Sequence, residues 1–140
     1  MATNTDNSKK IKVKIIQPTK IVLDSECDHI IIPGSVGDFG ISPGHTPLIT
    51  TIRPGTLIVY NNSKTSSYAL HDGFVTVEND IVRIVCEVVE SQSEIDRDRA
   101  EKAQKRATER LAAQNNGIDY RRAESALARS MARIQTVTEH

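Results

Sequence analysis

The sequence predicts an all-β sandwich followed by an antiparallel hairpin of two α-helices, and three observations support this fold class. All five prolines lie within the first 54 residues, and six of the seven glycines precede residue 74. Short apolar runs separated by turn-forming residues recur through this part and predict about eight to ten strands. From residue 94 onward the chain holds no proline and a single glycine, as helices require. We therefore divide the 140 residues into a disordered lead-in over 1–9, a β-sandwich over 10–92 and a two-helix hairpin over 93–140.

The first strand is predicted over residues 11–16, where apolar and charged side chains alternate with the period of two that half-buried strands show. Further strands follow at the apolar runs 21–23, 29–32, 48–49, 56–60, 68–70, 74–77 and 81–89. Tight turns are predicted at Pro54-Gly55, Asn61-Asn62 and Asn79-Asp80, each of which stands between two such runs. A unit of about 80 residues can bury a modest core, so this part is expected to fold alone.

The first helix is predicted to begin with Ser93 as its N-cap, because Asp96 three positions later completes a capping box, and to end near residue 114. Small apolar side chains form one stripe on each helix: Ala100, Ala103, Ala107 and Leu111 on the first, and Ile118, Ala123, Ala126, Leu127, Ser130, Met131 and Ile134 on the second. The short connection Asn115-Asn116-Gly117 predicts that the two stripes face each other. Since alanines bury little area, we expect a marginal hairpin that docks on another surface and undocks from it.

A charged repeat opens both helices. The hexad Ile95-Asp96-Arg97-Asp98-Arg99-Ala100 returns 23 positions later as Ile118-Asp119-Tyr120-Arg121-Arg122-Ala123. Arginines then follow at matching spacings of seven and four, at 99, 106 and 110 and at 122, 129 and 133, so each helix carries an arginine stripe. Two interpretations stay open. The stripes are solvated faces with i,i+4 ion pairs such as Glu101 with Lys105, or they bind an anion, since guanidinium groups suit phosphates and carboxylates.

The formal charge is zero, with 18 basic and 18 acidic side chains, so no long-range field attracts nucleic acid or anionic lipid. This zero is the sum of two opposite net charges. Residues 1–93 carry 8 basic and 10 acidic groups, net −2, and residues 94–140 carry 10 basic and 8 acidic groups, net +2. No apolar run approaches the roughly 20 residues that span a bilayer. We predict no nucleic-acid partner and no direct membrane insertion.

Cys27 and Cys86 match no metal or redox spacing and are expected to be buried, reduced thiols.

Catalytic chemistry has no positive support in the sequence. There is no G-x-x-x-x-G-K-[ST] motif, and the glycines at 34, 37 and 40 do not match the dinucleotide-binding fingerprint. A small hydrolase would have to use His45 or His71 with Asp72, but no serine or cysteine nucleophile is placed with them. We predict no catalytic residue, no metal site and no required cofactor. Apart from enzymes, the sequence leaves open a free-standing adaptor or chaperone-like module that presents a basic hairpin, and we keep this as an alternative function.

The segment IPGSVGDFGISPGHTPLIT over residues 32–50, followed by Arg53-Pro54-Gly55, resembles the epsilon subunit of bacterial F-type ATP synthase. So do DGFVTV over residues 72–77 and both hexads, and the resemblance extends from about residue 10 to residue 134. It implies the same sandwich and hairpin. It also implies a non-catalytic subunit of the rotor stalk in a proton- or sodium-translocating ATP synthase, peripheral to the cytoplasmic face of the bacterial inner membrane.

The resemblance further implies three kinds of partner: the gamma subunit, the ring of c subunits, and the alpha and beta catalytic subunits. Asp38, in the loop 34–38, corresponds to a position that faces the c ring, and His45 and Thr50 correspond to positions near gamma. The hairpin of this family also adopts an extended state that rises along gamma and inhibits ATP hydrolysis. Arg122, with Arg129 and Arg133, corresponds to basic residues that then meet the catalytic subunits.

ATP is the regulatory ligand that the resemblance implies. Some members of the family bind it in the compact state, through an upstream glutamate, the first hexad and arginines of both helices. The corresponding residues here are Glu90, Ile95, Asp96, Arg99, Arg106, Arg129 and Arg133. A ligand that binds only the compact hairpin stabilises that state, so ATP is expected to relieve inhibition.

Overall fold

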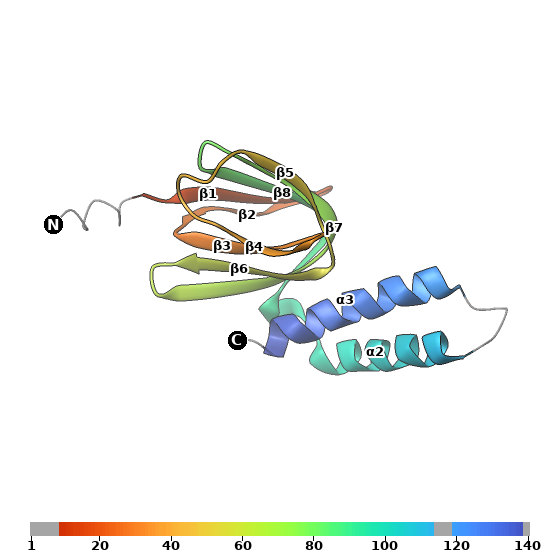
Figure 1. Cartoon of the computed structure of the whole chain (residues 1–140). Helices are drawn as coiled ribbons and strands as arrows, with labels where there is room; N and C mark the ends of the chain where they lie inside the picture. Colours follow the sequence, from red (N-terminus) through yellow and green to blue (C-terminus); the bar gives the residue numbers. More distant parts are fainter. Residues whose placement is uncertain (1–8, 114–118, 139–140) are drawn as a thin grey trace.

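The computed structural model describes residues 9–113 and 119–138, and within them it shows eight strands, one short 3₁₀ helix and two α-helices (Figure 1). The elements are β1 (Ile11–Gln17), β2 (Lys20–Cys27), β3 (His29–Gly34), β4 (Gly37–Ile41), β5 (Leu48–Ile52), β6 (Gly55–Asn61), β7 (Lys64–Glu78), β8 (Ile81–Ser91), η1 (Gln92–Glu94), α2 (Arg97–Ala112) and α3 (Tyr120–Thr138). The predicted fold class is confirmed, at the lower end of the predicted number of strands. The lead-in, apart from Lys9, and the connection Asn115-Asn116-Gly117 lie outside the described residues.

The strands are hydrogen-bonded in the order β2-β1-β8-β7-β5-β3-β4, and β6 pairs with both β3 and β7. Strand β1 runs parallel to β8, so the first and last strands of the sandwich lie side by side. The core is built of isoleucines, valines, leucines and the two cysteines, and Ile15, Ile32, Leu57, Val75 and Ile84 are completely buried in it. Such side chains pack well on a pleated sheet. The sandwich therefore has its own core, separate from the hairpin.

Strand β7 joins two runs that the sequence predicts as separate strands, 68–70 and 74–77. It pairs with β6 over its first half and with β5 over its second half. Asp72 lies between the halves with a φ of 46°. Leu70 and Val75 both face the core although they are five positions apart, so the side-chain alternation switches at this bend. The bend carries β7 from one layer of the sandwich to the other.

The turn between β7 and β8 is the one predicted at Asn79-Asp80. Both residues have positive φ, 54° and 62°, as a two-residue type I′ hairpin requires. Strand β4, in contrast, has no predicted counterpart, although it pairs with β3 along its whole length. Its two glycines, Gly37 and Gly40, and the charged Asp38 hide the apolar alternation by which a strand is recognised.

The N-cap of the first α-helix is Asp96, so the prediction of Ser93 is wrong. Ser93 lies within η1, and α2 begins at Arg97 and ends at Ala112. Asp96 Oδ1 accepts a hydrogen bond from the backbone N–H of Arg99 at 3.1 Å, because an acidic side chain directly before the helix satisfies one of its free donors. The second hexad repeats this arrangement. Asp119 Oδ1 accepts from the backbone N–H of Arg122, also at 3.1 Å.

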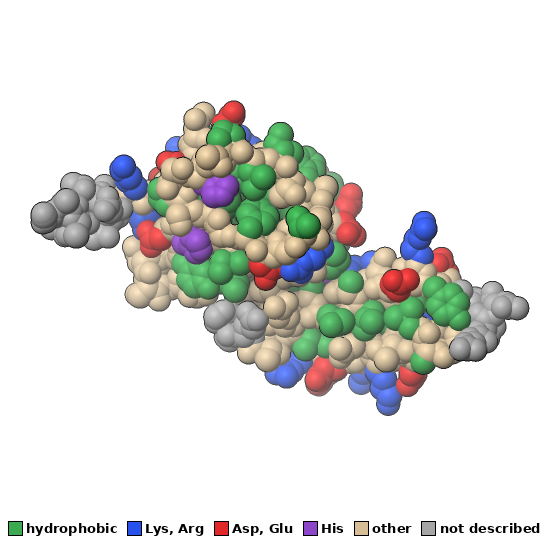
Figure 2. Space-filling view, viewed as in Figure 1, with side chains coloured by type: hydrophobic (Ala, Val, Ile, Leu, Met, Phe, Trp, Pro, Cys, Tyr) green, Lys and Arg blue, Asp and Glu red, His purple; other side chains and the backbone are tan. Residues whose placement is uncertain are grey.

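Helix α3 packs against α2 and also against β6 and β7, so it lies between α2 and the sandwich (Figure 1). Ala100 and Ala123 are buried as predicted, but Met131, predicted for the same stripe, is 51% exposed. Ala132 and Thr136 are buried instead. The prediction of a single stripe on α3 is therefore wrong, because this helix has two partners. Hydrophobic side chains also reach the surface along the hairpin (Figure 2). Neither described α-helix has the long apolar stretch that crossing a membrane requires.

Candidate functional site at the hairpin junction

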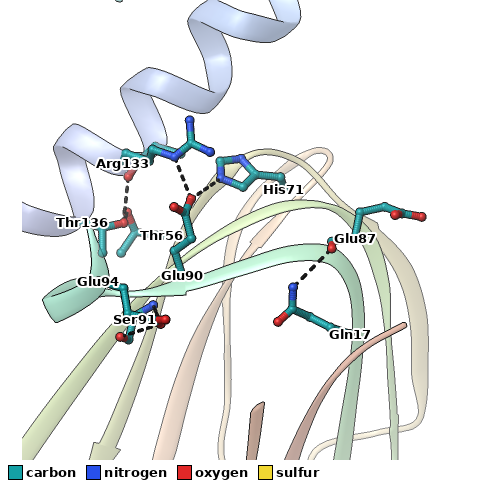
Figure 3. A network of polar contacts seen from close by, with 10 residues as sticks. Gln17, Thr56, His71, Glu87, Glu90, Ser91, Glu94, Arg133 and Thr136 are labelled. Carbon is teal, nitrogen blue, oxygen red and sulfur yellow. Dashed lines mark hydrogen bonds and ion pairs between the residues drawn. The ribbon is translucent and has the colours of Figure 1, made fainter. Parts of the chain in front are cut away.

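Glu90, near the end of β8, joins the hairpin to the sandwich. Its Oε1 lies 2.6 Å from Nε of Arg133 on α3 and 3.2 Å from Nε2 of His71 on the neighbouring strand β7 (Figure 3). The side chains of Arg133 and Glu90 are 29% and 27% exposed, so their contact is partly shielded from water. Such charge-assisted hydrogen bonds are stronger than those between neutral groups. One carboxylate oxygen therefore links two strands and a helix.

A pair of buried threonines makes the second contact between the two units. The hydroxyl oxygens of Thr56 on β6 and Thr136 on α3 are 2.9 Å apart. Since the Thr136 hydroxyl donates to the carbonyl oxygen of Ala132 at 2.7 Å, Thr56 is the donor of the shared bond. The side-chain amide of Gln92 also donates to the Thr136 carbonyl oxygen, at 3.2 Å. Specific polar contacts thus contribute to holding the hairpin in place.

A cavity of about 410 Å³ lies beside the contact between Glu90 and Arg133. Its lining comes from β8, η1, the connection to α2, α2 itself and α3: Glu90, Glu94, Asp96, Arg99, Ala100, Ala103, Arg106 and Arg133. This volume is within the range of roughly 300–1,000 Å³ that small-molecule sites occupy. Because the walls come from both the sandwich and the hairpin, the cavity is complete only when the hairpin is docked.

The lining holds three arginines and three acidic side chains, but the acidic ones are already bonded within the protein. Glu94, for example, accepts hydrogen bonds from the backbone N–H and the hydroxyl of Ser91, which hold its pKa below the ordinary value. Arg99 and Arg106, in contrast, have no ion-pair partner among the residues that the structure describes. Two unpaired guanidinium groups suit an anionic ligand, and a polyphosphate in particular.

The structure brings together five of the seven residues predicted to bind ATP: Glu90, Asp96, Arg99, Arg106 and Arg133 all line the cavity. The other two lie outside its lining. Ile95 is half-buried between η1 and α2, and Arg129 is half-buried on α3, where its charge acts on His71.

The four residues predicted to contact partner proteins come from different elements, and none of them lines the cavity. Asp38, on β4, is exposed and forms an ion pair with Arg53. His45, between β4 and β5, is half-buried, and its Nδ1 is 2.7 Å from the carbonyl oxygen of the next residue. Thr50 is half-buried on β5, and Arg122 is exposed in the first turn of α3.

The sandwich exposes apolar side chains near Thr50. Ile49, on β5, is 77% exposed, and Phe74, on β7, is 45% exposed. The strand register places Phe74 beside Val85 of β8, and Val85 beside Ile16 of β1. We call Ile16, Val85 and Phe74, together with Ile49, the apolar row; Ile49 lies diagonally beside Phe74, whose direct partner on β5 is Thr51. Ile49 and Phe74 are its exposed members, whereas Ile16 and Val85 are half-buried. A partly exposed apolar surface of this kind is typical of a protein–protein contact.

Sequence reasoning considered His71 only for a small hydrolase and missed its contact with Glu90. The structure buries its side chain against Glu90, while the adjacent Asp72 is exposed. The turn at Asn79-Asp80 could have revealed this contact from the sequence, because it sets the register of the two strands. Counting back from that turn places Ala69 opposite Glu90, and hence the histidine diagonally beside the carboxylate.

The fold and the site together define a class of two-domain chain, in which a β-sandwich carries a C-terminal helical hairpin with an arginine-lined cavity at the junction. Residues 10–92 match the family model described as ATP synthase, Delta/Epsilon chain, beta-sandwich domain. Residues 93–138 match the model described as ATP synthase, Delta/Epsilon chain, long alpha-helix domain. The chain belongs to the ATP synthase delta/epsilon chain family, as an epsilon-type subunit.

Two curated relatives illustrate the similarity. The ATP synthase epsilon chain of Nitratidesulfovibrio vulgaris (strain DP4) is 36% identical over 127 residues, which cover 91% of this chain and 95% of that one. The ATP synthase epsilon chain of Desulfitobacterium hafniense (strain Y51) is 40% identical over 122 residues, covering 87% and 92%.

Two solved structures share the fold. One is a chain of the Euglena gracilis mitochondrial ATP synthase, in a structure of OSCP, F1 and the c-ring, with a TM-score of 0.80 at 22% identity. The alignment covers 88% of this chain and 78% of that one. The other belongs to the central stalk and c-ring of the Tetrahymena thermophila mitochondrial ATP synthase, with a TM-score of 0.63 at 16% identity and coverage of 93% and 98%.

Proposed function

We propose that this chain is a non-catalytic subunit of the central stalk, which couples gamma to the c ring and restrains ATP hydrolysis through its movable hairpin. The observation that carries the proposal is the junction itself. Glu90 with Arg133, and Thr56 with Thr136, are polar contacts that can open without exposing the core of the sandwich. The docked hairpin is the compact, non-inhibitory state. In the extended state, α3 leaves the sandwich and brings Arg122 and its neighbours toward acidic segments of the catalytic subunits.

ATP is the ligand that we propose for the cavity. Arg99 and Arg106 bind its phosphates, and Arg133 contributes from the facing helix while bonded to Glu90. Because α2, α3 and β8 all contribute to the walls, ATP binds the docked hairpin alone and stabilises it by mass action. A hundredfold excess of ATP over its Kd would favour the docked state by about 2.7 kcal/mol.

The partner surfaces follow from the exposed groups. We assign the apolar row to the gamma subunit, with His45 and with Thr50 on the same strand as Ile49, because Ile49 and Phe74 offer exposed apolar area. We assign the tip of the β3–β4 hairpin, with Asp38, to the polar loops of the c ring. On this proposal the subunit lies at the cytoplasmic face of the bacterial inner membrane and reaches it through the c ring.

Isothermal titration of the full-length chain with ATP, with and without Mg²⁺, tests the ligand. Arg106→Gln is expected to weaken binding at least about tenfold, since a charged hydrogen bond to a phosphate is lost. The matched control is Arg110→Gln, because Arg110 lies on the same helix, exposed and outside the cavity lining. Absence of heat up to millimolar nucleotide, or equal effects of the two variants, would remove ATP from the proposal.

The partner and regulatory roles are tested in the assembled complex. The chain is expected to co-purify with gamma and to lower the rate of ATP hydrolysis. Removing residues 94–140 is expected to leave gamma binding intact and to abolish inhibition. Failure to bind gamma would favour a free-standing adaptor, and inhibition that persists without the hairpin would contradict the mechanism.

A further inference from the structure

His71 is an unusual residue at the interface between the hairpin and the sandwich. Its side chain is 1% exposed, and its Nε2 lies 3.2 Å from Glu90 Oε1 (Figure 3). Its other ring nitrogen, Nδ1, is buried and has no hydrogen-bond partner among the described residues. Buried polar atoms are nearly always bonded, so a bare Nδ1 in this position requires an explanation.

The neighbouring groups define which form of the ring fits. The Glu90 carboxylate can only accept, so Nε2 carries the proton and Nδ1 holds a lone pair. A second proton would turn Nδ1 into a buried donor without an acceptor. It would also place a positive charge next to Arg133, which bonds to the same Glu90 oxygen, and within the influence of the Arg129 charge on the same helix. The docked interface is therefore built for neutral imidazole.

We propose that His71 is a positioning residue for the hairpin junction: neutral His71 orients Glu90 toward Arg133, and protonation of His71 releases the hairpin from the sandwich. The inference that protonation releases the hairpin rests only on the contacts at the junction. Its effect on ATP hydrolysis rests on the function proposed above.

The direction of the pH effect follows from the charges that face the ring from each packed element, namely Glu90 on β8 and Arg129 and Arg133 on α3. Burial lowers the pKa of His71 below its ordinary value, and the two arginines act in the same direction against the opposing Glu90. When the hairpin leaves, the ring meets water and its pKa returns toward about 6.5. The released state therefore binds the proton more tightly than the docked state does. The docking equilibrium constant therefore has its full value above about pH 6.5 and falls as the pH drops below that value.

This proton sensitivity reaches the cavity as well, because Glu90 and Arg133 form part of its wall. Acidification is expected to lower the affinity for a ligand that needs the docked hairpin, and to increase the share of extended, inhibitory hairpin. A fall in pH would thus act in the opposite direction to ATP.

Energy transfer between two dyes on the full-length chain, without nucleotide, measures docking directly. Glu78→Cys on β7 and Arg110→Cys on α2 provide exposed labelling positions, and the native thiols are buried at 0% and 2% exposure. Between about pH 8 and pH 5.5 the docking equilibrium constant is expected to fall up to about tenfold. His71→Gln, which can donate to Glu90 but cannot take a proton, is expected to remove this dependence, and His29→Gln, on β3, to leave it unchanged.

Nuclear magnetic resonance titration of the His71 ring in the unsubstituted chain provides the second measurement, and it needs no variant to fold. A His71 pKa below about 6.5 is expected. A pKa at or above that value, docking that is independent of pH, or a His71→Gln chain with the full pH dependence would overturn the inference. The outcomes are separable: if ATP fails to bind while docking still titrates, only the nucleotide proposal fails.

Discussion

Glu90 Oε1 and Arg133 Nε lie 2.6 Å apart although 43 positions separate the two residues in the sequence. The bond joins the last strand of the sandwich to the last helix of the hairpin. Because neither side chain belongs to the core cluster of the sandwich, substitution at this contact reports on docking and spares the sandwich itself.

Glu90→Gln is expected to weaken docking by about tenfold, because Arg133 loses its charged acceptor while it stays partly buried. The measurement is the energy transfer between sandwich and hairpin at a fixed pH near 8. Glu87→Gln is the control, since Glu87 is exposed on the same strand and its carboxylate has no bonding partner within residues 9–113 and 119–138, while its backbone carbonyl accepts a bond from Gln17. Equal effects of the two substitutions would show that the carboxylate of Glu90 does not hold the hairpin.

The threonine pair is expected to show strong coupling in a double-mutant cycle. Thr136→Val leaves the hydroxyl of Thr56 buried and without its acceptor, which costs about 1–3 kcal/mol of docking free energy. Adding Thr56→Val removes the stranded group, so the double variant is expected to dock better than the single one. Hydrogen exchange of the α3 amides at one pH measures this, with the exposed Thr138→Val as control. Strictly additive effects would contradict the shared hydrogen bond.

Gly73→Ala is expected to destabilise the sandwich by more than about 2 kcal/mol, because overpacking forces the strands apart. A Cβ at this position would lie 2.1 Å from the carbonyl oxygen of Val85 and 2.9 Å from Cα of Cys86 on the paired strand. Gly37→Ala is the comparison: its φ is 144° and its surroundings are open, so the cost is backbone strain of about 1 kcal/mol. Urea unfolding of both variants measures the two losses of stability. Equal unfolding midpoints would be inconsistent with the close packing of Gly73 against β8.

Both thiols are expected to resist thiol reagents in the folded chain near pH 8. Burial raises the pKa of Cys27 to about 11 and that of Cys86 to about 12, so little thiolate forms. In an unfolded chain the same thiols ionise near about pH 8.5. The folded state therefore holds these protons more tightly, and stability is lost as the pH rises above that value. Colorimetric thiol counting with and without denaturant checks this, and rapid modification of the native chain would contradict it.

The order of a sandwich followed by two helices could be predicted because backbone requirements are local. Turns need glycine, proline and asparagine, and helices exclude them, so the change of composition near residue 93 is visible before any contact is known. Five of the seven residues that the family resemblance implies for ATP binding line the cavity. Asp96, Arg99 and Arg106 lie close together in the sequence, whereas β8 and α3 bring Glu90 and Arg133 to them. The fold class therefore follows from short-range pattern, and the set of site residues follows from the resemblance.

The remaining features depend on partners that are distant in sequence. Periodicity identifies one apolar face of α3, whereas Thr136 is buried by β6 and Met131 is left exposed. Strand β4 carries little apolar pattern and is recognised by its pairing with β3. His71 is a routine core residue until β8 places Glu90 and α3 places Arg133 around it. The contact between His71 and Glu90 could have been found by counting back from the turn at Asn79-Asp80, but the other contacts cannot be predicted from a window of a few residues.

The parallel pairing of β1 with β8 determines the order in which the chain can fold as it is synthesised. β1 joins β2 early, but its other edge stays open until residues 81–91 have left the ribosome. Closing so long a loop is slow compared with forming the β7–β8 turn. Once β8 is in place the sandwich is finished, and the hairpin is the last described part to emerge. It therefore meets a completed surface, and its alanine-rich helices do not compete with the strands for the core during synthesis.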